Sequence, residues 1–376
     1  MSEFAAGPAG RIERVRALMV ERGYDAIVVR DEANLRWLTG VKGVFDYTFE
    51  FPHAAFITAD QCLFHTDSRY LNSFEENTPA SSPWVYDMDE GTIPGWVAGK
   101  IAANKCRVCA VEDDMQINFY QGIQRGLEDR SVACMLPLMH DDIRKMRAIK
   151  DAEEIELMRH AQSITDAAFQ HMLGFIKPGM TEKQVRNELE NFMFANGADS
   201  LAFGSIVASG PNTANPHAVP SDRVIEKGDF VLMDYGAGYC DYRSDMTRTV
   251  VMGEPTQEQL DLYALVRRTH EECVAAIHPG VEGNDIFKLS KKIIGDAGYG
   301  DYYNHGLGHG VGIDIHELPN FNRSKNTIEV GSVITMEPGV YLPGVGGVRL
   351  EDYGVVTENG YEPFTKTPHD LHIIDC

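Results

Sequence analysis

The segment VIEKGDFVLMD (224–234) matches a second segment of the chain, TIEVGSVITME (327–337). In each, a glycine precedes a short apolar run typical of a buried strand, and each run ends in a carboxylate, Asp234 or Glu337. A carboxylate that ends a buried strand is costly unless a cation or hydrogen-bond donors balance it. The two segments therefore predict a repeated fold with a polar site where the strands end.

Further matches surround these segments in the same order along the chain. The additional pairs are IKPGMTE (176–182) with IHPGVEG (277–283), HAVP (217–220) with HELP (316–319), and SDMTRTVVM (244–252) with LEDYGVVT (350–357). Asp245 thereby pairs with Glu351, and His217 pairs with His316. Such ordered self-similarity indicates an internal duplication.

The duplication predicts the domain organisation. Residues 143–376 are expected to form two helix–helix–strand units that face each other about a pseudo-twofold axis. Residues 1–142 show strands alternating with helices, which is typical of a separate α/β domain. Just past this boundary, the run from Met146 to Gln162 predicts the start of a long helix. The predicted fold class is α/β (α+β) with two domains.

Five residues of the second domain have the types that bind metal ions. They are Asp234, Asp245, His309, Glu337 and Glu351. Four carboxylates and an imidazole suit hard or borderline divalent ions and can hold two of them. Two-metal sites of this kind activate water and stabilise a developing oxyanion, so the set indicates hydrolysis.

The segment HGLGHGVGIDIHE (305–317) interleaves histidines with glycines, which allow close backbone approach. His309 completes the carboxylate set. His305 and His316 are expected either to support the ligands from behind or to contact the substrate, in positions to donate to a tetrahedral oxyanion or a leaving amine. His217 is included because it aligns with His316. A lone histidine is more often structural than catalytic, but three in one glycine-rich loop favour a functional role.

Arg349 precedes Glu351 by two residues, so strand alternation places both on one face. Arg349 is expected to offset negative charge around the metals or to touch the substrate. The alternative is an ordinary salt bridge within the sheet.

Composition excludes several classes of protein. The formal charge of −22 argues against a nucleic-acid partner, which requires a basic surface. No apolar run approaches the ~18 residues of a membrane span, and the first residues lack the layout of a secretory signal. The seven scattered cysteines are typical of reduced thiols. We therefore expect a cytoplasmic protein that binds neither membranes nor nucleic acid.

Taken together, these motifs resemble the pita-bread metallopeptidases, and within them the Xaa-Pro branch that contains aminopeptidase P and prolidase. The segments that carry the resemblance are IVASGPNTANPH (206–217), LMDYGAGYCDYRSDMTRTV (232–250), GLGHGVGIDIHELP (306–319), MEPGVY (336–341) and GVRLEDYG (347–354). In the first domain, NLRWLTGV (34–41) and TDSRY (66–70) are similar to the creatinase-type domain of that branch. The resemblance covers nearly the whole chain.

The resemblance implies a role for each metal ligand. Asp234 would chelate one ion, and His309 and Glu337 would bind the other. Asp245 and Glu351 would bridge the two ions, which in this family are most often manganese or cobalt and sometimes zinc. A hydroxide that bridges the metals would attack the carbonyl of the residue before proline.

The resemblance also implies the groups that surround the metals. His217 and His316 would contact the substrate and stabilise the tetrahedral species, and His305 would line the pocket on the proline side. Tyr341 and Arg349 fall on positions near the active site, where they would bind substrate. The expected partners are a proline-containing peptide and a second copy of the chain, in a homodimer.

The segment GVFDYTFEFPH (43–53) departs from the pattern, because it is unusually aromatic and acidic. One hypothesis is that Phe45, Tyr47, Phe49 and Phe51 shape access of the substrate to the active site. The alternative is a strand edge that packs on its own domain or at a dimer contact.

Other functions remain open at this point. The same fold serves creatinase, an amidinohydrolase without metal, and some lyases. A metal-dependent lyase or another non-peptidase hydrolase is an alternative because ligands do not identify a substrate, and a non-catalytic pita-bread scaffold is another. The motifs do not separate an aminopeptidase from a dipeptidase.

Overall fold

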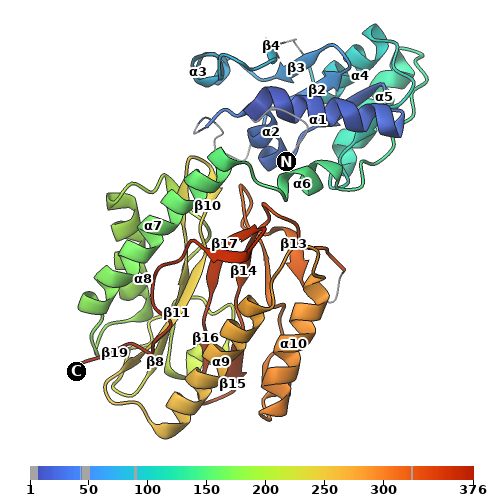
Figure 1. Cartoon of the computed structure of the whole chain (residues 1–376). Coiled ribbons are helices and arrows are strands. Elements are labelled where there is room, and N and C mark those ends of the chain that lie inside the picture. The colour runs from blue at the N-terminus through green and yellow to red at the C-terminus, as the bar shows by residue number, and fades with distance from the viewer. Residues whose placement is uncertain (1–6, 43, 45–50, 89–90, 323–324) are drawn as a thin grey trace. The chain divides into compact units, whose positions relative to one another are not determined.

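A computed structural model of the chain describes residues 7–42, 44, 51–88, 91–322 and 325–376. The chain divides into two compact units, Met1–Arg147 and Ala148–Cys376 (Figure 1). Each unit has its own sheets and its own buried core. The predicted fold class, with helices and strands in two domains, is confirmed.

The first unit is built on a mixed sheet with the strand order β4-β3-β2-β1-β5. Its strands are β1 (Ala26–Val29), β2 (Ala54–Thr58), β3 (Cys62–His65), β4 (Val85–Asp87) and β5 (Cys109–Val111). Its helices are α1 (Gly7–Arg22), α2 (Glu32–Thr39), α3 (Leu71–Asn77), α4 (Ile93–Ala103), α5 (Ile117–Asp129) and α6 (Asp142–Arg147). Apolar side chains of α4 and α5 pack against β1 and β2 to form its core. The alternation of strands and helices predicted for this part is confirmed.

The predicted long helix begins later than Met146. The chain forms the short helix α6 and then a break, and α7 (Ala152–Phe175) starts after Asp151. Asp151 accepts a hydrogen bond from the Glu154 N–H, while the Glu154 side chain accepts one from the Asp151 N–H. This capping box fixes the start of the helix, because it satisfies main-chain donors that would otherwise lack partners.

The second unit contains two pairs of long helices and several sheets. Its helices are α7, α8 (Glu182–Ala195), α9 (Gln257–Ala275), α10 (Gly283–Asp296) and the short η1 (Gly210–Ala214) and η2 (Gly300–Tyr302). Its strands are β6 (Ser200–Leu201), β7 (Ile206–Ser209), β8 (Phe230–Tyr235), β9 (Ala237–Tyr239), β10 (Tyr242–Arg243), β11 (Met246–Met252), β12 (Gly308–Gly310), β13 (Glu317–Phe321), β14 (Val333–Met336), β15 (Gly339–Leu342), β16 (Gly346–Arg349), β17 (Asp352–Thr357), β18 (Gly360–Pro363) and β19 (Ile373–Ile374).

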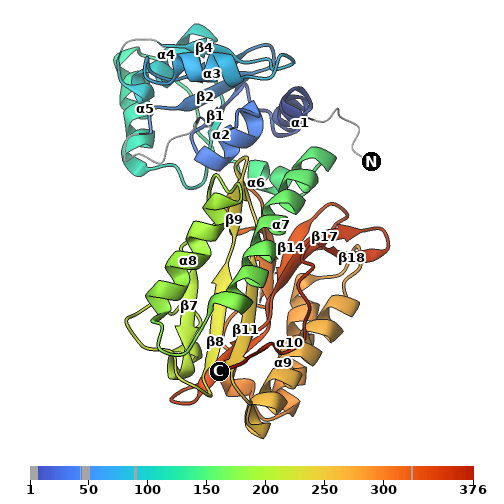
Figure 2. The same ribbon diagram turned by 90° about the vertical axis from the view of Figure 1, so that its left-hand side faces the viewer.

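Each half of this unit has two long helices followed by antiparallel strands, as the duplication predicts. In the first half β7, β8 and β11 are antiparallel neighbours, and in the second half β12, β14 and β17 are antiparallel neighbours. Gly179 and Gly280, at matching positions before α8 and α10, both adopt positive φ angles. One helix pair, α7 and α8, lies on a different side of the strands from α9 and α10 (Figures 1 and 2).

Each helix pair covers its own half of the core. Side chains of α7 and α8 pack against β8 and β11, and side chains of α9 and α10 pack against β14 and the strands beside it. The strand ends that carry the predicted ligands are thereby fixed by two buried cores. Within the described ranges, no helix combines the length and apolarity needed to cross a bilayer.

Most of the aromatic segment 43–53 lies outside the described residues, including Phe45, Tyr47 and Phe49. Phe51 is described, and its ring lies edge-on to that of His53, with ring centroids 4.9 Å apart. The role of this segment stays a prediction.

Candidate active site

The five predicted metal ligands lie on matching elements of the two halves. Asp234 lies on β8 and Glu337 directly follows β14, while Asp245 and Glu351 directly precede β11 and β17. His309 is the middle residue of β12. All five side chains line one cavity of about 430 Å³, so the structure brings the whole set together.

Glycines on both sides of His309 let its strand approach its neighbours closely. A Cβ atom on Gly308 would lie 2.2 Å from the Thr335 oxygen, and one on Gly310 would lie 2.1 Å from the Leu318 oxygen. Real side chains do not tolerate such contacts, so both positions require glycine. The prediction that these glycines allow close backbone approach is confirmed at Gly308 and Gly310.

The ring of His309 is oriented as a metal ligand would be. Its Nδ1 lies 3.0 Å from the Gly310 carbonyl oxygen, to which it can only donate, so Nε2 keeps its lone pair. Nε2 lies 3.7 Å from Asp245 Oδ2 and 3.7 Å from Glu337 Oε1. These separations are too long for hydrogen bonds but suit donor atoms around a shared cation. One ligand atom each of Asp245, His309 and Glu351 lies within 4.8 Å of the other two.

The carboxylates crowd one another in a buried setting. Burial, together with the charges of neighbouring carboxylates, raises the pKa of Asp245 and of Glu351 well above the usual range. Burial, reinforced by the charge of Asp234, raises the pKa of Glu337 to about 8. A group of acids in this state is stabilised by bound cations, which remove the repulsion between them.

Two oxygen atoms of the set lack any hydrogen-bond partner among the described residues, although both are buried. They are Asp234 Oδ1 and Asp245 Oδ1. Buried polar atoms are normally paired, and a metal ion would give both a partner. The donor types, their spacing and these two oxygens therefore fit divalent metal ions.

Arg349 lines the cavity beside the acids, on the same side as Glu351, as strand alternation predicts. Its Nη2 donates to Asp234 Oδ2 at 2.5 Å, and its Nη1 donates to the Tyr341 hydroxyl oxygen at 2.9 Å. It is 2% exposed, so its charge acts at close range on the acids. The guanidinium thus offsets part of the negative charge.

Tyr341 does not line the cavity, unlike the other predicted site residues. Its hydroxyl lies 2.9 Å from His305 Nε2, and it also accepts from Arg349. His305 Nδ1 lies 2.6 Å from the Gly306 carbonyl oxygen. Since that carbonyl can only accept, Nδ1 carries the proton and Nε2 accepts from the Tyr341 hydroxyl. Both nitrogens of His305 are therefore engaged, and its ring forms part of the cavity wall. Burial, helped by the charge of Arg349, lowers its pKa to about 3.

His217 and His316 both line the cavity and are exposed. The ring of His316 stands edge-on to His309, with ring centroids 4.3 Å apart. Burial of part of the ring, together with His217, lowers the pKa of His316. These two imidazoles, from matching segments of the two halves, are free to face a bound ligand.

Two threonines that support the ligands were not anticipated. The Thr247 hydroxyl donates to Glu351 Oε2 at 2.7 Å and accepts from Arg349 Nε at 3.1 Å. Thr335 Oγ1 accepts from the His309 N–H at 3.1 Å. Thr247 has a signal in the sequence, because it lies two residues after Asp245 and so shares its side of the strand.

A buried ion pair holds the loop that carries His316. Lys150 Nζ lies 3.0 Å from Glu317 Oε2, and their side chains are 1% and 5% exposed. Glu317 Oε1 also accepts from the Asp314 N–H at 3.1 Å. The pair ties the backbone beside His316 to the segment before α7.

The chain matches known families over most of its length. Residues 156–358 match the family described as Metallopeptidase family M24, and residues 11–149 match the Creatinase/Prolidase N-terminal domain. An Xaa-Pro dipeptidase of Pyrococcus furiosus is 44% identical over 232 residues, which cover 61% of this chain and 67% of the relative.

Solved structures are similar over nearly the whole chain. An Xaa-Pro dipeptidase from Bacillus anthracis is 36% identical with a TM-score of 0.89, covering 98% of this chain and 100% of that one. An X-Pro aminopeptidase from Thermotoga maritima is 30% identical with a TM-score of 0.85, covering 97% of this chain and 100% of that one.

Proposed function

Because the chain belongs to metallopeptidase family M24 and carries the creatinase/prolidase N-terminal domain, we propose that it cleaves the peptide bond before proline in peptides or dipeptides. The observation that carries the proposal is the complete set of five ligands and three histidines around one cavity. The similar proteins named Xaa-Pro dipeptidase and X-Pro aminopeptidase support the choice of substrate.

The five ligands would hold two divalent ions, with Asp245 and Glu351 shared between them. Asp234 would complete one site, and His309 and Glu337 the other. We favour manganese because most of the donors are oxygen atoms, with cobalt and zinc as alternatives. When bound, such ions polarise a carbonyl oxygen and lower the pKa of a water molecule.

The protein groups around the ligands position the substrate. His217 and His316 face the cavity and can donate to an oxygen atom that gains negative charge during the reaction. Arg349 holds Asp234 in place and keeps a positive charge beside the acids. The apolar side chains of Phe203 and other residues in the cavity wall exclude water from part of the space. The Tyr341 hydroxyl keeps the His305 ring in one orientation.

A metal-dependent lyase or a non-peptidase hydrolase on the same fold remains the second candidate, because the ligands alone do not choose the substrate. A non-catalytic scaffold is disfavoured by the intact ligand set. We also propose a homodimer, in line with the family resemblance, and light scattering on the purified protein tests it.

The function is tested with the metal-reconstituted protein on three peptides: Ala-Pro, Ala-Pro-Ala and Ala-Ala. We expect release of alanine from a proline-containing peptide and little from Ala-Ala. Cleavage of Ala-Pro alone identifies a dipeptidase, and cleavage of Ala-Pro-Ala identifies an aminopeptidase.

The ligand assignment is tested in parallel. Asp245→Ala and Glu351→Ala should each abolish turnover while the circular dichroism spectrum is retained, because each removes a carboxylate that would be shared by both ions. Glu358→Ala, at an exposed position, is the matched control and should behave as wild type. Normal turnover in either ligand variant would contradict the assignment.

A further inference from the structure

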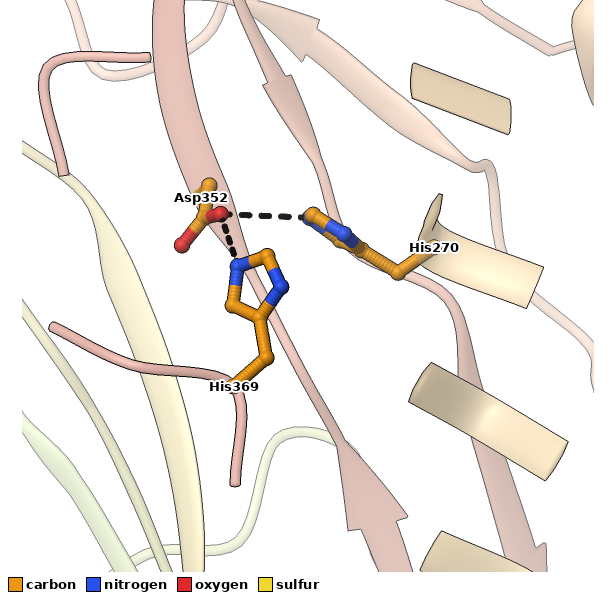
Figure 3. A group of neighbouring side chains, drawn as sticks. All are labelled: His270, Asp352 and His369. Carbon is orange, nitrogen blue, oxygen red and sulfur yellow. Dashed lines mark hydrogen bonds and ion pairs between the residues drawn. The ribbon is translucent and has the colours of Figure 1, made fainter. Parts of the chain in front are cut away.

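A second group of metal-binding side chains lies in the same unit as the catalytic cavity but does not line it. His270 projects from α9, Asp352 is the first residue of β17, and His369 lies in the segment between β18 and β19. Asp352 directly follows Glu351, so the two side chains point to opposite sides of the extended chain. Figure 3 shows the three side chains directed toward one another from three separate elements.

One separation between the donor atoms matches that around a single ion, and a second would have to lengthen. Asp352 Oδ2 lies 2.5 Å from His369 Nε2 and 3.6 Å from His270 Nε2. Zinc–ligand bonds of about 2.0–2.1 Å place tetrahedral donor atoms roughly 3.4 Å apart. The distance from His270 to Asp352 is close to that value. The ring of His369, which is 26% exposed, would need to move by about 1 Å.

The state of His270 is a separate indication of a missing partner. This residue is 1% exposed, and neither of its ring nitrogens has a hydrogen-bond partner in the part of the chain that the structure describes. Buried ring nitrogens are normally satisfied. A metal ion bound to Nε2 would satisfy the nitrogen that faces Asp352.

A neighbouring arginine orients the carboxylate donor of this group. Arg248 Nη2 donates to Asp352 Oδ1 at 2.7 Å, which leaves Oδ2 directed toward the imidazoles. His369 Nδ1 lies 3.9 Å from Glu271 Oε1, on the side of the ring away from Asp352. This separation is too long for a hydrogen bond, and Glu271 Oε1 accepts from Arg267 Nε at 2.8 Å, so Glu271 adds charge near the ring but does not fix its orientation.

The local charge permits a cation. The positive charge of Arg248 repels a cation, but Asp352 balances that charge. The guanidinium also donates to the main-chain oxygen of Thr367. Arg267 pairs with both Glu271 and Asp370. These two carboxylates and Asp352 still outnumber the two guanidinium groups by one, so the local charge stays negative.

We propose that His270, Asp352 and His369 form a site for one transition-metal ion of the zinc class, with water completing the coordination. Two imidazoles and one carboxylate favour zinc over manganese, in contrast to the carboxylate-rich cavity. The ion would join α9, β17 and the C-terminal segment that carries His369. This site is independent of the reaction catalysed in the cavity.

The test measures the zinc content of the full-length protein. Metal-free wild type and His369→Gln are dialysed against the same micromolar ZnCl₂ solution, freed of unbound ions, and analysed for zinc per chain by mass spectrometry. His278→Gln, which replaces an exposed histidine on the loop after α9, is the matched control. The cavity is intact in all three proteins, so zinc bound there cancels in the comparison.

We expect His369→Gln to bind about one zinc ion fewer per chain than wild type and His278→Gln. The rise in Tm caused by zinc should be smaller in His369→Gln for the same reason. His270→Gln, checked for folding by circular dichroism, provides a second variant with the same expected loss. Wild-type zinc content in both folded variants would overturn the proposal. A failure to cleave Xaa-Pro peptides would leave this comparison unchanged.

Discussion

Replacing Glu337 with glutamine is expected to make the metal-free protein more stable than wild type. With metal bound, the variant is expected to be less stable than wild type. Without metal, the carboxylate is mostly buried near Asp234, and its pKa is raised from 4.5 to about 8. The folded state therefore binds more protons than the unfolded state between these two pH values, and stability falls as the pH rises through that window. Glutamine carries no charge and removes this contribution.

The size of the effect follows from the pKa. Each pKa unit corresponds to about 1.4 kcal/mol, so the rise to about 8 sets a ceiling of about 5 kcal/mol at pH 8. Glu337 and the neighbouring acids titrate as a coupled group. Replacing Glu337 alone therefore recovers only part of this free energy, roughly 2 kcal/mol. In a unit of this size that corresponds to a rise in Tm of about 4–8 °C. At pH 5 the difference should be small.

Bound metal is expected to reverse the sign of the stability difference between Glu337→Gln and wild type. An ion at a hundredfold excess over its Kd stabilises the folded state by about 2.7 kcal/mol, and a variant that lacks the Glu337 carboxylate gains less of this. The assay is thermal unfolding of wild type and Glu337→Gln from pH 5 to pH 8, with EDTA and then with MnCl₂. Glu358→Gln, at an exposed position, is the control. The reasoning is refuted if metal-free Glu337→Gln melts at or below wild type at pH 8, or if its advantage does not grow with pH.

Three further variants test the groups that support the site. Thr247→Val removes the hydroxyl that donates to Glu351 at 2.7 Å. Titration calorimetry should show metal affinity reduced by about 10–100-fold. Unchanged affinity would show that Thr247 does not position Glu351 for metal binding. Tyr341→Phe removes the hydroxyl that lies 2.9 Å from His305 Nε2. Urea unfolding should show a loss of about 1–3 kcal/mol, whereas wild-type stability would show that this hydrogen bond contributes nothing. Lys150→Met removes the ammonium group that pairs with Glu317 at 3.0 Å. We expect a loss of about 3–5 kcal/mol in the same assay, and a neutral result would mean that the ion pair does not hold the loop.

The grouping of the five candidate ligands around one cavity and the duplicated architecture could be predicted, because both correspond to patterns in the sequence. Asp234 and Glu337 end matching apolar runs, and the cavity that they share follows from the symmetry of the repeat. The aromatic segment 43–53 has no such counterpart, so sequence pattern alone left its role open.

Contacts between distant segments could not be predicted in the same way. The start of α7 depends on the capping box at Asp151, which overrides the apolar spacing that begins at Met146. The position of Tyr341 behind the cavity wall depends on how β15 packs next to Arg349. The convergence of His270 with Asp352 joins segments that no local pattern connects.

The most direct test of the central claim is hydrolysis of an Xaa-Pro peptide by the metal-free protein as MnCl₂ is added in steps. The account predicts no cleavage by the metal-free protein, and activity that rises with added metal until both ions are bound and disappears again on chelation. Equal cleavage with and without metal would contradict the role of the five ligands. If the protein binds two ions but cleaves none of the Xaa-Pro peptides, the proposed reaction is contradicted.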